Sequence, residues 1–183
     1  MKIFKQTYFV TTILIVSLFL FSCNSDDNGN SDPNLSSTEH HTYNITLENG
    51  ETFTGELPKY TGDTFYYASF INTDEDTNQK HLAILLNETQ KVNLGVAFIL
   101  DTQNQPNTTF NPTGIRIKPW NSEKIYTAQQ YSATLENFEE HSVNVYGEDN
   151  QIASFTLHFE GTFSNSLNDE IVSGSGTITI AAP

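Results

Sequence analysis

Basic residues are scarce in this sequence. It has 8 Lys and Arg against 22 Asp and Glu, so its formal net charge is −14. A nucleic-acid partner would need a basic surface to meet its phosphates, and electrostatic adhesion to an anionic membrane would need a cluster of Lys and Arg. The charge balance therefore argues against nucleic acid and against a polybasic membrane patch.

Several catalytic motifs are also missing. The sequence contains neither a Gly-x-Ser-x-Gly nucleophile elbow nor a glycine-rich phosphate-binding loop. Neighbouring carboxylates, such as those at 139–140 and 169–170, are too common in so acidic a chain to mark a catalytic pair, because glycosidase carboxylates are recognised by their separation in space. No catalytic residue follows from the sequence, and an enzyme is unsupported.

Cysteine occurs once, at Cys23. It is preceded by Lys2, Lys5 and the mostly apolar run 8–21, which is the layout of a secretory signal with a positive n-region and an apolar h-region. The run is shorter than the about 20 residues that a membrane-spanning helix needs. We therefore expect a signal peptide at residues 1–22 and no permanent transmembrane helix.

The residues around the cysteine resemble the lipobox of bacterial lipoproteins, with Leu20 three positions before Cys23 and the small Ser22 directly before it. That family prefers a small residue where Phe21 stands. The resemblance implies cleavage before Cys23, a diacylglycerol on its thiol and an acyl chain such as palmitate on the new amino terminus. Two or more acyl chains hold a protein stably on a membrane. An ordinary secretory signal with an incidental cysteine is the plainer alternative.

Ser25, Asp26 and Asp27 look like the short acidic export signal of Bacteroidota surface lipoproteins. The resemblance implies an outer-membrane lipoprotein that faces the cell exterior, with a periplasm-facing anchor as the alternative. Acidic residues are also common in solvated linkers.

With Cys23 used as an anchor, no cysteine is left for a disulfide, a thiol nucleophile or a zinc-thiolate site. Residues 23–41 comprise the lipidated cysteine and a segment rich in Asn, Ser and Asp, which predicts a flexible tether. Residues 42–183 have the size of one ordinary domain.

Alternating apolar residues at 43–47 and 53–57 predict two strands joined near Asn49 and Gly50. A two-residue Asn-Gly turn would pair Thr46 with Phe53 and put the apolar residues on opposite faces. A three-residue loop at 48–50 instead pairs Ile45 with Phe53 and gives Gly50 the left-handed position of a bulge. We predict the longer loop.

Further strand patterns occur at 65–71, 81–86, 92–100 and 115–118, separated by polar loops. Gly95 is expected to mark a bulge or a close approach. A hairpin turning at 147–150 leads into the clearest alternation, in which Phe155, Phe159 and Phe163 share one face, and residues 172–180 repeat the pattern. We expect this pair to be antiparallel, with one buried and one wet face.

Residues 127–140 are ambiguous. A capping-box pattern begins at Thr127, and Ala128, Tyr131 and Leu135 have helical spacing. Tyr131, Ala133 and Leu135 also alternate as in a strand. We predict a short helical turn at 127–131 followed by a strand. About nine to ten short strands without a βαβ rhythm predict an all-β fold, an antiparallel β-sandwich or a barrel-like sheet.

The oxygen-bearing side chains of Asp74, Asp76 and Asn78 have the spacing that opens a calcium loop. The rest of an EF-hand is missing, because Gln79 and Leu85 stand where glycine and glutamate would be needed. A solvated hairpin tip is therefore favoured, with calcium as the alternative, and no other cofactor is expected.

A second candidate site contains histidines. His158 and Glu160 share the polar face of one strand, where His81 and His141 could join them in a metal or acid-base site. The plainer interpretation is that these side chains are solvated neighbours on adjacent strands with no site between them.

The aromatic residues Trp120, Tyr126 and Tyr131 lie near a long polar loop, as in sugar-binding sites. Core packing explains the same aromatics.

The sequence therefore predicts a non-enzymatic surface lipoprotein that binds an extracellular glycan or protein. A lipid-anchored hydrolase or metal-dependent enzyme, and an accessory of envelope structure or assembly, are the alternatives.

Overall fold

A computed structural model describes residues 40–59, 68–108, 114–145 and 147–183, all of which belong to the unit Ser37–Pro183. The signal peptide, Cys23, residues 24–39 of the predicted tether and residues 65–67 of a predicted strand lie outside the described residues. In the part of the chain that is described, no helix is long and apolar enough to cross a membrane.

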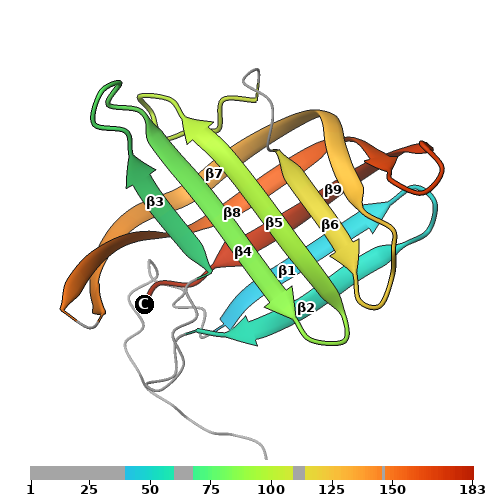
Figure 1. Cartoon of the computed structure of the whole chain (residues 1–183), viewed down its shortest axis with the longest axis horizontal. Helices are drawn as coiled ribbons and strands as arrows, with labels where there is room; N and C mark the ends of the chain where they lie inside the picture. Colours follow the sequence, from blue (N-terminus) through green and yellow to red (C-terminus); the bar gives the residue numbers. More distant parts are fainter. Residues whose placement is uncertain (1–39, 60–67, 109–113, 146) are drawn as a thin grey trace, which may run out of the picture. The chain divides into compact units, whose positions relative to one another are not determined.

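The described strands form one antiparallel sheet, shown in Figure 1. In chain order they are β1 (His40–Leu47), β2 (Thr52–Pro58), β3 (Ser69–Thr73), β4 (Lys80–Glu88), β5 (Val92–Leu100), β6 (Ile115–Pro119), β7 (Tyr126–Val145), β8 (Glu148–Asn165) and β9 (Ile171–Ile180). Their order in the sheet is β2-β1-β9-β8-β7-β6-β5-β4-β3. The prediction of an all-β antiparallel fold is confirmed.

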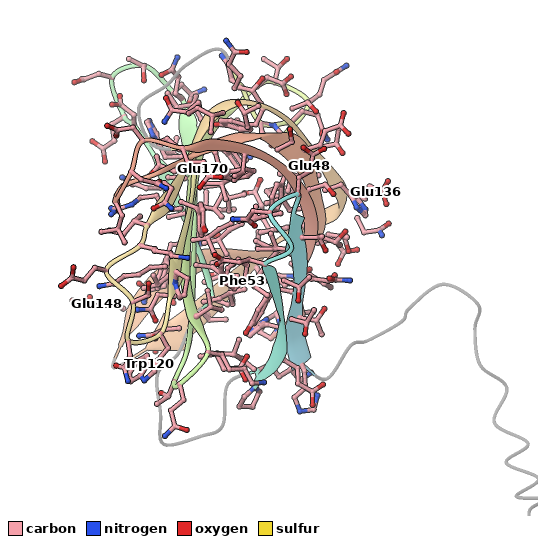
Figure 2. All side chains as sticks on the ribbon, turned by 90° about the vertical axis from the view of Figure 1, so that its right-hand side faces the viewer. Glu48, Phe53, Trp120, Glu136, Glu148 and Glu170 are labelled. Atoms are coloured by element: carbon pink, nitrogen blue, oxygen red, sulfur yellow. The ribbon has the colours of Figure 1, made fainter. Side chains whose placement is uncertain are left out.

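The sheet folds over into two layers, as in a sandwich. β3 to β6 form one layer, and β1, β2, β7, β8 and β9 form the other (Figures 1 and 2). Only two residue pairs, Arg116 with Thr127 and Ile117 with Tyr126, join β6 to β7 where the layers meet. The sheet is not closed, because β2 and β3 remain its two end strands.

The core lies between the layers and is built from alternate residues of both. Phe155, Leu157 and Phe163 of β8 are buried there as predicted. Glycines of β9 make room for these large side chains, because β8 and β9 pair Phe159 with Gly176. A Cβ atom at Gly176 would lie 2.6 Å from Cζ of Phe159. The predicted antiparallel pair with one buried face is therefore confirmed.

The predicted three-residue loop between β1 and β2 is confirmed. Ile45 pairs with Phe53, and the Leu47 N–H donates to the Glu51 carbonyl at 2.9 Å. Gly50 has a φ of 90°, in the left-handed region that favours glycine.

The predicted helical turn at 127–131 is wrong, because β7 is extended through the whole segment. Register shifts lie between Ala128 and Gln130 and between Glu136 and Glu139. Each extra residue moves the inward-facing position by one, so the inward residues Ala128 and Tyr131 are three apart. A bulged strand thus reproduced the spacing of a helix.

Four smaller expectations also change. β8 begins at Glu148, before the predicted turn at 147–150 ends, because Asn144 Oδ1 accepts from the Gly147 N–H and closes an earlier turn. β1 begins at His40, two residues inside the predicted tether. Gly95 marks no bulge, since it pairs regularly with Leu85, and no described residue other than its chain neighbours has an atom within 4 Å of a Cβ placed there. Two of the strands, β7 and β8, are also long, with 20 and 18 residues.

Candidate functional site: a polar sheet face

The outer face of β1, β9, β8 and β7 carries mainly hydroxyl and amide side chains, and we call it the polar face. Cross-strand pairing forms it into rows. One row consists of Asn44, Thr177, His158 and Thr134. The next consists of Thr46, Ser175, Glu160 and Ser132. Because side chains alternate along each strand, the core-facing residues between them fix this outward set.

Two adjoining hollows of about 470 and 740 Å³ lie on the polar face. Both are broad and open to solvent. They share the row from Thr46 to Ser132, and the second hollow extends to Glu48, Gln130, Thr162 and Ser173. None of the described residues that line them is a lysine or an arginine. Together the hollows form a shallow, weakly acidic strip.

His158 is the side chain in the strip that contacts both a hydroxyl group and a carboxylate. Its Nδ1 lies 3.2 Å from Oγ1 of Thr177, and its Nε2 lies 3.4 Å from a carboxylate oxygen of Glu136. The order carboxylate, imidazole, hydroxyl is that of a nucleophilic triad. Both flanking distances are long, however, and both ionisable side chains are largely exposed, so solvent screens their interaction.

The histidines of the predicted metal or acid-base site do not come together. His141 Nε2 bonds Ser154 Oγ at 2.8 Å, and neither His141 nor His81 lines the hollows. Across the described ranges, no group of three or more His, Cys, Asp and Glu side chains is placed to hold a metal ion.

The predicted calcium residues form the turn between β3 and β4. Oδ1 of Asp74 accepts from the N–H groups of Asp76 and Thr77 at 3.0 and 2.8 Å, and Asn78 has a φ of 55°. The backbone hydrogen bond from Thr77 contributes most to lowering the pKa of Asp74. This geometry is that of a solvated hairpin tip, and a calcium ion would compete with the turn for Asp74. The calcium site stays a prediction.

The three predicted sugar-binding aromatics are dispersed. Trp120 is 40% exposed in the turn after β6, and Figure 2 shows it on the opposite side of the sandwich from Glu48 and Glu136. Tyr126 is fully buried. Tyr131 packs on Phe98, with ring centroids 6.1 Å apart. Trp120 is therefore open to a ligand on one side of the sandwich, and Tyr131 lines the second hollow of the polar face.

Tyr126 instead belongs to a clamp that joins the β1–β2 loop to the start of β7. Its hydroxyl donates to Oε1 of Glu51 at 2.7 Å, and Lys124 Nζ donates to the same oxygen at 2.8 Å. Burial raises the pKa of Tyr126, with help from Glu51. Burial would raise the pKa of Glu51, but the hydrogen bonds from Lys124 and Tyr126 outweigh it, so the pKa is lowered. A phenol that is harder to ionise is a poor nucleophile, so this cluster is structural.

A second, similar cluster joins β1 to the end of β4. The Tyr43 hydroxyl donates to Oε2 of Glu88 at 2.6 Å, and Lys91 forms an ion pair with the same carboxylate. Burial and the bond to Glu88 raise the pKa of Tyr43. Gly55 leaves room for this contact, because a Cβ there would lie 2.0 Å from Oε2 of Glu88.

Sequence reasoning found the polar side of β8 but missed its neighbours, including Asn44, Thr46 and Ser175. The Ser and Thr residues at alternate positions of β9 could have predicted that this strand contributes to the polar face. The pairing of β1 with β9, which brings opposite ends of the domain together, has no local signature.

Comparison with known proteins identifies no relative. No family model, no curated protein and no solved structure matches the chain.

Proposed function

We propose that this protein is a non-enzymatic binding module that holds an extended glycan on its polar face. The observation that carries the proposal is the pair of adjoining open hollows along β1, β9, β8 and β7. Hydroxyl and amide side chains can both donate to and accept from sugar hydroxyls. Since the hollows are continuous and unenclosed, they suit a chain of sugar units better than a small molecule, which is usually held in a deep cleft.

A peptide fits this face less well. Extended peptides are held by main-chain hydrogen bonds to an exposed strand edge. The polar face is centred on β8 and β9, and each of these strands pairs with a neighbour on both sides. Their backbone groups are thus already used, and only side chains remain to bind a ligand.

Glycan-array binding by the full chain in detergent micelles tests this role. Ser175 is exposed and lines both hollows, so Ser175→Tyr should fill them and abolish binding. Asn72→Tyr is the matched control, because Asn72 is exposed on β3 in the other layer and lines neither hollow. Failure of the wild type to bind any glycan, or full binding by Ser175→Tyr, would overturn the proposal.

The lipobox-like residues Leu20 to Cys23 and the acidic residues that follow support a lipid anchor on Cys23, in the outer membrane and facing the cell exterior. Labelled palmitate should be incorporated into the wild type and not into Cys23→Ser. Protease added to intact cells should degrade the wild type. An unlabelled wild type would refute the anchor, and protection from protease would place the domain on the periplasmic side.

A hydrolase is the second candidate, favoured by the line from Glu136 through His158 to Thr177. Activity of the wild type on ester or glycoside substrates, lost in both His158→Ala and Thr177→Ala, would favour it over the binding module. Equal, background-level rates in all three proteins would exclude it for those substrates.

A further inference from the structure

Gly95 is a glycine that the fold does not require. It lies in the middle of β5, on the outer face of the other layer, between Leu85 of β4 and Arg116 of β6. Its φ is not in the left-handed region, and no described residue other than its chain neighbours has an atom within 4 Å of a Cβ built there. Glycine inside a strand is destabilising relative to alanine. Where no bulge or packing explains it, such a glycine indicates close approach of another molecule.

Two cations stand beside Gly95 without acidic partners. Arg116 and Lys118 are exposed on the outer face of β6, and neither forms an ion pair with any described residue. Among the other described lysines, those at positions 80, 91 and 124 each pair with a glutamate, whereas Lys59 does not. Arg116 is also the only arginine in a chain whose net charge is −14. Unpaired cations on so acidic a protein indicate an anionic ligand.

Two further side chains belong to the same face. Asn93 pairs in register with Lys118, and its buried Oδ1 has no hydrogen-bond partner among the described residues. Native proteins rarely leave a buried acceptor unpaired, and functional sites are a common reason. Trp120 follows Lys118 by two positions, is 40% exposed and lies on the outer side of this layer in Figure 2.

We propose that the face centred on Gly95 binds a carboxylate-bearing sugar residue, a uronate of an acidic polysaccharide. The guanidinium of Arg116 matches a carboxylate in a planar, two-bond geometry, and Lys118 adds a second positive charge. The bare backbone at Gly95 lets a flat sugar ring approach the sheet. This site lies on the layer opposite the polar face and does not depend on the function proposed there.

An anionic membrane is a poorer occupant. Each cation near an anionic surface contributes only weakly to membrane binding. Two of them would have to overcome the repulsion of a domain that is acidic as a whole. By contrast, the two cations that are present are sufficient to bind a single carboxylate at this site.

Calorimetric titration of the full chain in detergent micelles tests the site. The probes are a galacturonate trisaccharide, the matched galactose trisaccharide and inorganic phosphate. The wild type should bind galacturonate at least about 10-fold more tightly than either comparison ligand. The reason is that its carboxylate forms charge-assisted hydrogen bonds, and about 1.4 kcal/mol of binding free energy corresponds to a tenfold change in affinity.

Two variants assign the binding to this face. Gly95→Val should lower galacturonate affinity at least about 10-fold while keeping or raising the melting temperature, because a β-branched residue suits an outward strand position. Arg116→Gln should lower the affinity similarly, and Lys59→Gln should leave it unchanged.

Any of three results would overturn the proposal: no binding of galacturonate, equal affinity for galactose or phosphate, or unaltered binding by folded Gly95→Val and Arg116→Gln. Because Ser175→Tyr blocks only the polar face, its effect separates the two sites.

Discussion

His41 is a buried histidine whose protonation opposes folding. It is 5% exposed, and its Nδ1 accepts a hydrogen bond from the Ala181 N–H at 3.0 Å. Burial, with smaller effects of His40 and Lys59, lowers the pKa of His41 from 6.5 to about 4. The hydrogen bond from Ala181 to His41 attaches the start of β1 to the last residues of the chain.

The lowered pKa predicts a pH dependence of stability. As pH falls below 6.5, the unfolded chain takes up a proton that folded His41 refuses until about pH 4. Stability from this group is therefore complete above pH 6.5 and is lost between pH 6.5 and 4. At pH 5 the loss is about 2 kcal/mol.

Urea unfolding at pH 7 and pH 5 measures this loss. His41→Asn can keep an acceptor near the Nδ1 position but cannot titrate, so its stability should fall by about 2 kcal/mol less than that of the wild type over this interval. Parallel losses in the two proteins would show that His41 is not the titrating group.

At the scale of the element, glycines in strands have two different roles. Gly176 of β9 is enclosed, since its Cβ would lie 2.6 Å from Phe159 Cζ and 2.8 Å from Ile45 Cγ1. Gly95 of β5 faces open space. The same substitution should therefore have opposite effects at the two positions.

Gly176→Ala should lower the free energy of unfolding by about 1–3 kcal/mol, because the added methyl group overpacks the core. Gly95→Ala should leave it unchanged or raise it by about 0.5–1 kcal/mol. Thermal and urea denaturation of both variants provide the comparison. A Gly176→Ala protein as stable as the wild type would show that the core can move to admit the methyl group.

At the scale of the whole molecule, Ser69 connects the two layers. It is buried, and its hydroxyl donates to the Ala153 carbonyl at 2.6 Å and accepts from the Ala153 N–H at 3.0 Å. β3 and β8 are not paired by backbone hydrogen bonds, and the Ser69 hydroxyl thus supplies the hydrogen bonds that connect them. An ion pair between Lys80 and Glu140 spans the same side of the sandwich.

Ser69→Ala should lower the free energy of unfolding by about 2 kcal/mol or more, since it leaves a buried N–H and a buried carbonyl without partners. Ser142→Ala, at an exposed position of β7, should change it by less than about 0.5 kcal/mol. Denaturant titration measures both. Equal stabilities of the two variants would mean that water or a rearranged loop satisfies Ala153.

The sequence by itself determined the all-β class, most strand positions and the three-residue loop at Gly50. These follow from the two-residue period of a strand and from the conformational freedom of one glycine, both of which act over a few residues. Even the misassigned turn at 127–131 had a local origin, because the bulge after Ala128 moved the inward-facing residues to a helical spacing.

Only the tertiary structure decided which strands are neighbours and therefore which side chains share a surface. The polar face takes residues from Asn44 to Thr177 because β1 pairs with β9, and that pairing depends on contacts between distant parts of the chain. The same long-range packing buried Tyr126 and left Trp120 and Gly95 on the opposite face. Periodicity tells which residues of a strand face outward, whereas the choice of neighbouring strands, and with it any binding surface, is fixed by the burial of the whole core.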